Sequence, residues 1–546
     1  MWIPLPGPLL LLTLTSTLVQ PVYSQCPIYT NYAYHKHLPL SEGKWQLASM
    51  RPIPPCRTFK SQEVEDTIER LRKVIVDPDL FRLFENTWPS TLDTTIAWTG
   101  VANKSVIVEL DPVMNKTTTW DASHKFQLTP QDVKKLEEDN EEELSFVITG
   151  DIEAMWLRDS ANQLQAYTSV LRASSKRGSL ASLFRGAINL QARYILGDPF
   201  CNAFQAPVES KIMRKSSANS DTISPPYDYM TVFSCQWELD SVASFLQLSA
   251  DYLRMTGDVA FFGKHAWVSA VKKVLEITEA MMIGSYDAAG NWQHTPYTYC
   301  APYGGTPIND CNGSPHRAVG LVRSFQRPSD DSCIYQYLVP SNMMYAVALN
   351  ASLPIMAAVS PRGSNLTAWM RNMSSTITTA IQAHAIVKDP NHGPIYAYEI
   401  DGYGSAILMD DPNVPSLLSA PFLNFTSATN PVYANTRRKI LSRDNPYYAW
   451  GPVISGVGSM HTLPGRAWPM ANIMAILTSD DDNEIMRNLR WLVQSTDGYG
   501  LMHESVHAHT AGVWSRQWFS WANGLFGQAI LDLERRKPWI LRMGFQ

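Results

Sequence analysis

The sequence predicts an all-α protein built as an (α/α)6 barrel, with short β-strands in the loops. Three observations support this: about a dozen segments beyond residue 60 carry apolar residues at helical spacing, only short strand-like runs interrupt them, and no linker or fixed-period repeat divides them. A chain of 546 residues can bury one core of that size. Helix packing alone also permits an irregular all-α fold or a solenoid.

The predicted helices begin near residue 60 and continue to the C-terminal region. Ser61, a residue type that caps helices, precedes an apolar stripe that includes Val64 and Ile68. Gly197 and Gly257 follow two later stripes, as helix-terminating glycines do. Later helices are expected over residues 183–194, 242–253, 268–282, 341–353, 366–381, 485–493 and 514–533, and short strands over 105–110 and 144–148.

The N-terminus has the features of a targeting segment. An apolar run over residues 9–19 is followed by Val22-Tyr23-Ser24, a passable cleavage site. The run is too short to span a bilayer, so the sequence predicts a cleaved signal peptide over residues 1–24 and no membrane contact afterwards. Because no Lys or Arg precedes the run, an uncleaved anchor or a buried N-terminal segment stays the alternative. No later window is expected to cross a membrane.

Charge and cysteine content narrow the class of protein. The net charge is -5, the pI is near 6.2 and no basic cluster occurs, which argues against a nucleic-acid partner. The 7 Cys fit an oxidising compartment, and their odd number leaves at least one unpaired. Cys300 and Cys311 flank a Gly/Pro/Asn loop and are expected to form a disulfide. No CxxC, HExxH or His/Cys cluster occurs, so no metal site is expected.

Glycosylation sequons also favour a secreted or secretory-pathway protein. An Asn-X-Ser/Thr triplet without Pro begins at Asn103, Asn115, Asn312, Asn350, Asn365, Asn372 and Asn424.

The stretch TGDIEAMWLRDS, residues 149–160, concentrates chemically active side chains between a strand-like and a helix-like run. It contains Asp151, Trp156, Arg158 and Asp159. Such junctions lie at the rims of folds, where side chains can reach a ligand. An aromatic face beside carboxylates and an Arg suits a sugar. The alternative is a buried salt bridge that holds a turn in place.

Two further segments offer the paired carboxylates that glycoside hydrolysis requires. In CQWELDS, residues 235–241, Glu238 and Asp240 are two positions apart and cannot share one helix face. The alternative role of Asp240 is an N-cap. In GYGLMHES, residues 498–505, Glu504 lies in a Gly-rich loop, where packing does not readily explain it. The Trp residues that follow are more typical of a core.

Three other loops carry similar chemistry. They are residues 327–333, which precede a helix near Asn342, residues 409–416, and residues 456–462. One end of a helical barrel presents such polar loops before successive helices.

Several of these motifs, in order, resemble glycoside hydrolase family 125, a family of exo-acting α-mannosidases that release α-1,6-linked mannose. The motifs are TGDIEAMWLRDSANQ (149–163), WELDS (237–241), RPSDD (327–331), MDDPNVPSLL (409–418), GSMHT with AWPM (458–470), and MHES with WFSWANGLFG (502–527). The resemblance runs from about residue 56 to residue 533. It implies an (α/α)6 catalytic domain over 56–546, inversion at the anomeric carbon, mannose-containing glycans as substrates, and neither metal nor cofactor.

The resemblance also implies roles for particular residues. Asp240 corresponds to the general acid and Glu504 to the general base. The implied sugar-binding residues are Asp151, Trp156, Arg158, Asp159, Asn342 and His503. An N-terminal extension over residues 25–55 and longer loops at 103–143 and 300–311 lie outside the family pattern and bear on accessory subsites.

Alternatives remain at this stage. A helix N-terminus lowers the pKa of a carboxyl, whereas a general acid must hold its proton, so Glu238 is the alternative acid to Asp240. A trehalase-like or glucoamylase-like barrel hydrolase is a second interpretation of the chain. A non-catalytic mannoside-binding protein is a third.

Overall fold

The computed structural model of the chain describes residues 26–102, 142–215, 221–300 and 311–545. The signal peptide predicted over 1–24, the strand predicted over 105–110, and the sequons at Asn103 and Asn115 lie outside these residues.

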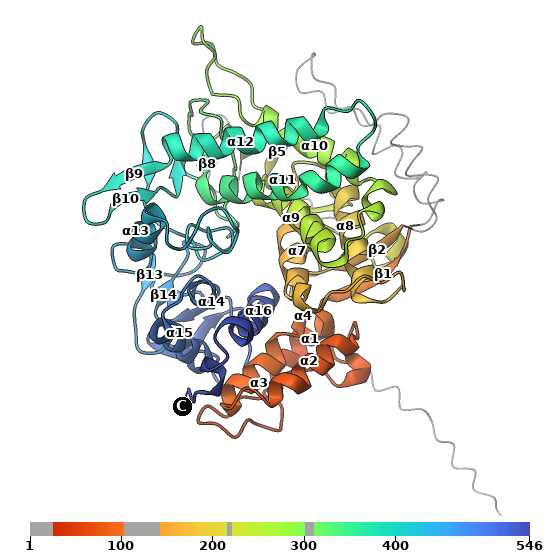
Figure 1. Cartoon of the computed structure of the whole chain (residues 1–546), viewed down its shortest axis with the longest axis vertical. Helices are drawn as coiled ribbons and strands as arrows, with labels where there is room; N and C mark the ends of the chain where they lie inside the picture. Colours follow the sequence, from red (N-terminus) through yellow and green to blue (C-terminus); the bar gives the residue numbers. More distant parts are fainter. Residues whose placement is uncertain (1–25, 103–141, 216–220, 301–310, 546) are drawn as a thin grey trace, which may run out of the picture.

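Helices pack in two concentric rings, and the chain passes round them once from the N-terminal to the C-terminal region (Figure 1). The inner helices are α7 (Leu157–Gln165), α9 (Leu239–Thr256), α11 (Val339–Val359), α14 (Pro469–Leu477) and α16 (Ser520–Arg536). The outer helices are α2 (Gln62–Arg72), α3 (Pro78–Thr87), α8 (Leu180–Gly197), α10 (Trp267–Ala280), α12 (Leu366–His384), α13 (Pro431–Ile440) and α15 (Asp482–Gln494). Between α12 and α13, where no inner helix is assigned, the chain forms turns that are buried over residues 416–420. The predicted fold class, an (α/α)6 barrel, is confirmed.

Short elements occupy the connections between these helices. They are helices α1 (Tyr29–Ala33) and α4 (Ser90–Thr94), and 3-10 turns η1 (Pro54–Cys56), η2 (Thr168–Val170), η3 (Val208–Ser210), η4 (Ala260–Gly263) and η6 (Ile540–Arg542). The antiparallel strand pairs are β1 (Ile96–Val101) with β2 (Glu143–Val147), β5 (Thr222–Ser224) with β7 (Thr298–Cys300), β9 (Ile386–Asp389) with β10 (Gly393–Tyr396), and β13 (Tyr448–Ala449) with β14 (Gly456–Val457).

Three small sheets stand directly before inner helices. Their members are β3 (Met155–Trp156), β4 (Ala203–Phe204) and β6 (Val232–Ser234); β8 (Tyr337–Leu338), β11 (Glu399–Ile400) and β12 (Ala406–Ile407); and β15 (Arg466–Ala467), β16 (Ser505–His507) and β17 (Thr510–Ser515). β3 runs into α7 and β8 into α11 without a break. These sheets therefore fix the loops at the N-terminal ends of the inner helices.

Helix boundaries agree with the sequence patterns in most places and differ in two. Gly257 ends α9 with a φ of 69°, as expected of a C-terminal glycine. The N-cap of α9 is Glu238, so Asp240 lies in the first turn and is not the N-cap. The helix predicted over 514–533 begins at Ser520, because residues 510–515 pair with β16 as strand β17. Trp514 thus belongs to a strand although its spacing from Trp518 is helical.

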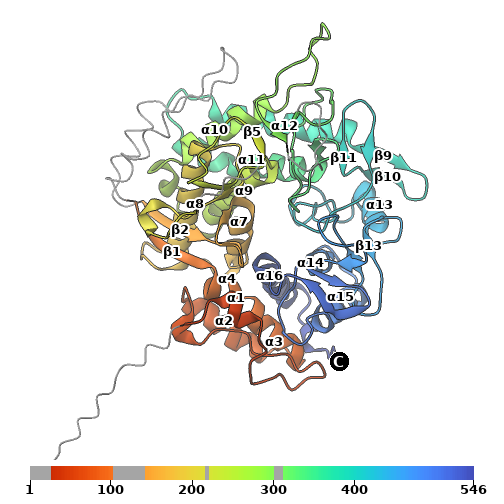
Figure 2. The same ribbon diagram turned by 180° about the vertical axis from the view of Figure 1, so that it is seen from behind.

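The barrel closes where the last inner helix meets the first outer ones. α16 packs against α3, α7 and α14, so the C-terminal and N-terminal elements lie side by side in both views (Figures 1 and 2). The Trp88 indole is fully buried at this contact and donates to Ala166 O at 3.0 Å. Gly527 of α16 lies against the same ring, and a Cβ at this position would overlap it.

Three disulfides occur, and the pair predicted from the sequence is one of them. They join Cys26 to Cys56, Cys201 to Cys235, and Cys300 to Cys311. Cys333 is free and buried, which accounts for the odd number. Disulfides persist in oxidising compartments, so the three bonds indicate an extracellular or secretory-pathway protein.

One helix among the described residues, α11, is long and apolar enough to cross a membrane, with a mean hydropathy of 1.4. The expectation that no later window is this apolar was wrong. However, α11 lies in the inner ring, and 56% of its most apolar window is buried inside the barrel. A core helix passes the same test of length and composition.

We predict that Gly527→Ala destabilises the protein. The added methyl group must displace Trp88 from a close-packed site, and overpacking of this kind costs about 1–3 kcal/mol. Gly197→Ala is the matched control, because nothing lies within 4 Å of a Cβ at the end of α8. Urea unfolding measures the stability of both variants. An unfolding midpoint for Gly527→Ala at or above that of the control would contradict the close contact between Gly527 and Trp88.

Candidate active site

A pocket opens at the N-terminal ends of the inner helices, where loops from distant parts of the chain meet. It is lined by Thr149, Ile152, Trp156, Arg158, Asp159, Pro328, Ser329, Asp330, Asn413, His461, Trp468, Glu504, Arg516, Phe519 and Trp521. Its open volume is about 40 Å³, room for a few water molecules. Asp330 and Arg516, which also line the pocket, are partly exposed.

Arg158 forms the floor of the pocket and organises the carboxylates around it. It is the second residue of α7 and is only 3% exposed. Its Nη1 donates to Glu238 Oε2 at 2.8 Å and to Asp240 Oδ2 at 3.1 Å. Its Nη2 lies 3.4 Å from Asp330 Oδ1, and its Nε lies 3.4 Å from Asp159 Oδ2. A buried guanidinium must be paired in this way, and four carboxylates share this one cation.

Glu238 and Asp240 lie behind Arg158 and do not line the pocket. Both side chains are fully buried at the start of α9. Burial raises the pKa of each carboxyl, and the nearby Arg158 opposes that rise. Burial thus acts against the lowering of the pKa that a helix N-terminus causes. Asp240 also accepts from Ser341 Oγ at 3.2 Å, so its oxygens are occupied by protein groups.

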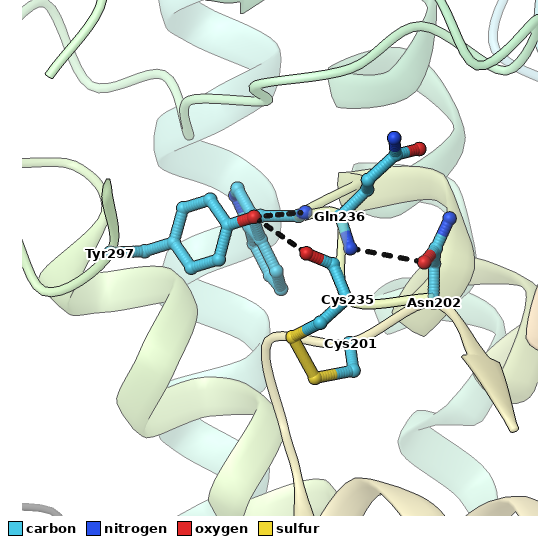
Figure 3. Close-up of a disulfide and its surroundings, with 6 residues drawn as sticks. Cys201, Asn202, Cys235, Gln236 and Tyr297 are labelled. Atoms are coloured by element: carbon cyan, nitrogen blue, oxygen red, sulfur yellow. Dashed lines mark hydrogen bonds between the residues drawn. A yellow bond between two sulfur atoms is a disulfide. The ribbon is translucent and has the colours of Figure 1, made fainter. Parts of the chain in front are cut away.

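A disulfide and a tyrosine fix the segment that carries these two acids. Cys235, three residues before Glu238, is bonded to Cys201 (Figure 3). The Tyr297 hydroxyl donates to Cys235 O at 2.9 Å and accepts from the Trp237 N–H at 3.3 Å. The Gln236 N–H donates to the side chain of Asn202 at 3.1 Å (Figure 3). The start of α9 is therefore held by its backbone as well as by Arg158.

Asp330 reaches the pocket from a tight loop before α11. The Arg327 N–H donates to Asp331 O at 2.7 Å, and the Asp330 N–H donates back to Arg327 O at 2.9 Å. Asp330 has a φ of 66°, a left-handed conformation that Asp tolerates better than most residues. Its side chain remains 38% exposed. Of the four carboxylates around Arg158, Asp330 is thus the one most open to a ligand.

Glu504 stands in the same pocket, immediately before β16. Its Oε2 accepts from Ser515 Oγ at 2.8 Å, and its Oε1 accepts from Arg516 Nε at 2.9 Å. Both partners come from the end of β17 and the residue after it. The side chain is 8% exposed. Glu504 therefore lines the pocket with both carboxylate oxygens hydrogen-bonded to protein groups.

Polar atoms in the pocket without protein partners suit the hydroxyl groups of a sugar. Trp156 Nε1 and Asn413 Oδ1 are buried and have no hydrogen-bond partner among the described residues. Burial raises the pKa of Asp159 to about 6. Asp331, 3.6 Å from His461 Nδ1, raises the pKa of that imidazole to about 9, so His461 is cationic at neutral pH.

The other residues predicted from the sequence lie outside the pocket. Asn342 uses its amide to bond Val322 and Leu338 backbone groups, with all distances at 2.9–3.0 Å. His503 stacks on Trp514 at 4.5 Å, and burial lowers its pKa to about 4. Neither Asn342 nor His503 lines the pocket. Asp151 lies at the edge of the pocket, paired with Arg516 Nη1 at 2.5 Å.

Several pocket residues were not singled out from the sequence. The loops containing Asp330, Asn413 and His461 were recognised as polar loops before helices, but nothing in their spacing marked these side chains. The sequence pattern predicts Trp521 as a core residue. In the structure Trp521 is buried in the core, with 1% of its surface exposed, and it also lines the pocket, where its ring lies 5.8 Å from the Arg158 guanidinium. The described residues contain no group of His, Cys, Asp or Glu that could hold a metal ion.

Comparison with known proteins places the chain in a family. The metal-independent α-mannosidase family GH125 matches residues 77–531. A Schizosaccharomyces pombe protein described as Meiotically up-regulated gene 157 protein is 42% identical over 526 residues, which cover 95% of each chain. A Streptococcus pneumoniae structure of this family, a non-productive complex with α-1,6-mannobiose, shares 32% identity with a TM-score of 0.71 and covers 87% of this chain and 99% of its own. The chain therefore belongs to the GH125 family of metal-independent α-mannosidases.

Proposed function

We propose that this protein is an exo-acting α-mannosidase that removes non-reducing terminal α-1,6-linked mannose with inversion of configuration. The observation that carries the proposal is the presence of two carboxylates, Asp330 and Glu504, in one pocket of a GH125 chain. The linkage is supported by the α-1,6-mannobiose bound to the bacterial relative.

The shape of the pocket supports exo action. Its floor and walls are buried side chains such as Arg158, Trp468 and Trp521, while the partly exposed residues lie at the mouth. We infer that a site with such a buried floor accepts the terminal sugar of a glycan and excludes an internal one. Trp156 Nε1, Asp159 and Asn413 are available for its hydroxyl groups.

In the proposed reaction, Glu504 removes a proton from water, and the water oxygen attacks the anomeric carbon. The bond from that carbon to the glycosidic oxygen breaks, and a carboxylic acid protonates the leaving oxygen. The family resemblance implies Asp240 as this acid, with Glu238 as the alternative. The structure favours Asp330, because Asp240 is covered by Arg158 whereas Asp330 is exposed in the pocket. We assign Asp240 and Glu238 to holding Arg158.

We propose a secretory route on the basis of the predicted signal peptide and the three disulfides. The sequons at Asn350, Asn365, Asn372 and Asn424 are exposed and accessible to glycosylation.

A mannoside-binding protein without turnover is the second candidate, and the paired carboxylates favour the enzyme over it.

Glu504→Gln is expected to remove nearly all turnover while mannoside binding persists. Gln keeps the shape of the side chain but accepts no proton from water, and general base catalysis contributes about 10²–10⁴-fold. Steady-state kinetics and calorimetric titration with mannobiose measure the two effects. Glu276→Gln, in outer helix α10, is the matched control and should turn over normally. Normal turnover in Glu504→Gln would exclude this residue as the base.

Asp330→Asn and Asp240→Asn together identify the acid. We expect Asp330→Asn to slow mannobiose hydrolysis far more than hydrolysis of an aryl mannoside, because a good leaving group requires little protonation. Asp240→Asn should slow both substrates by similar factors, because it acts through Arg158. The ratio of kcat/KM for the two substrates is the measurement. If instead Asp240→Asn slows mannobiose hydrolysis far more than aryl mannoside hydrolysis, and Asp330→Asn slows both equally, Asp240 is the acid.

The first product is expected to be β-mannose. Proton NMR of a fresh reaction distinguishes the anomers before they equilibrate. Inverting sites separate their carboxyl groups by about 6.5–9.5 Å to leave room for water, whereas retaining sites use about 5–5.5 Å. Accumulation of α-mannose first would contradict inversion and assign a nucleophile to the site.

A further inference from the structure

A second, larger cavity lies beside the reaction pocket. It has a volume of about 600 Å³, within the range of about 300–1,000 Å³ that ligand pockets occupy. Its walls come from three parts of the chain: the N-terminal segment 28–30, the β1–β2 region with residues 150–153, and the loop 205–215 with Phe233 and Trp518. Residues 28–30 precede the part of the chain that matches the family.

The two cavities are adjacent. Ile152 lines both. Asp151 of the larger cavity pairs with Arg516 of the reaction pocket. The Phe233 ring of the larger cavity lies 5.5 Å from the Trp156 ring of the reaction pocket. Ile152 and the Asp151–Arg516 pair therefore lie at the boundary between the two cavities.

The walls are held in place by specific contacts. Tyr29 packs edge-on against Trp518 at 4.7 Å and donates to Met50 O at 3.1 Å. On the opposite side, the Gln205 amide, which is buried, accepts from the Lys215 N–H at 2.9 Å and fixes the loop. The Cys26–Cys56 disulfide anchors the segment that carries Tyr29. The cavity is thus part of the folded structure.

The cavity surface combines exposed apolar side chains with polar groups. Ile28, Ile212, Met213 and Phe233 are large hydrophobic residues that remain 66%, 40%, 85% and 36% exposed. Apolar side chains gathered in one exposed place mark a binding surface. Thr30, Asp151, Glu153 and Lys215 supply hydrogen-bonding groups beside them. Sugars need both, because a pyranose presents C–H faces and hydroxyl groups together.

We propose that this cavity binds the sugar units on the reducing side of the scissile bond, so that the enzyme prefers oligosaccharides to disaccharides. This inference rests on the proposed function, since it assigns the leaving part of the same substrate. The N-terminal extension then supplies substrate specificity that the family-matching part of the chain does not contain.

The test compares kcat/KM for linear α-1,6-mannotetraose with kcat/KM for α-1,6-mannobiose. For the wild-type protein, the tetraose is expected to be favoured by about tenfold, the range that one or two apolar contacts provide. Ile28→Ser/Met213→Ser should reduce this preference to less than about threefold. Met543→Ser, an exposed methionine in the C-terminal segment, is the matched control and should keep it.

A third variant tests the direction in which the substrate leaves the pocket. Leu463 is 68% exposed and lies two residues from His461, which lines the reaction pocket but not the larger cavity. Loss of the length preference in Leu463→Ser but not in the double variant would overturn the inference. So would a wild-type protein that hydrolyses mannobiose and tetraose equally well, which leaves the proposed function intact. Absence of turnover on both substrates instead refutes the proposed function itself.

Discussion

A single buried guanidinium, that of Arg158, is the constraint on which the site depends. It comes from inner helix α7 and pairs with Glu238 and Asp240 at the start of α9 and with Asp330 from the loop before α11. An uncompensated charge at this depth is expensive, so these segments must come together for Arg158 to be tolerated. The cation thereby couples the assembly of the barrel to the assembly of the pocket.

The shared cation also divides the acids into two kinds. Glu238 and Asp240 are fully buried against it. Asp330 meets the same cation at its outer edge and keeps an exposed face. Arg158 therefore contacts the proposed general acid Asp330 as well as the buried Glu238 and Asp240, and these three carboxyls differ in their access to the pocket.

A second network joins the loops on the other side of the pocket. Asp411 accepts from Ser329 Oγ at 3.0 Å and from Ser459 Oγ at 2.8 Å, and burial raises its pKa to about 6. Arg327, in the same loop as Asp330, pairs with buried Glu399 at 2.6 Å. These contacts tie three loops together below Asp330 and His461. A tight pocket can be preorganised in this way although most of its lining comes from loops.

The sequence by itself determined the helical barrel, the loops that carry the chemistry and the Cys300–Cys311 bond, and its resemblance to a family proposed Glu504 as the base. These features are encoded locally, in apolar spacing, turn residues and short motifs. Only the tertiary structure decided that Asp330 faces the pocket while Asp240 lies behind Arg158, that Asn342 and His503 support the site from outside it, and that residues 28–30 wall a second cavity. The exposure of a carboxylate depends on which distant segments cover it, and local sequence patterns do not contain that information.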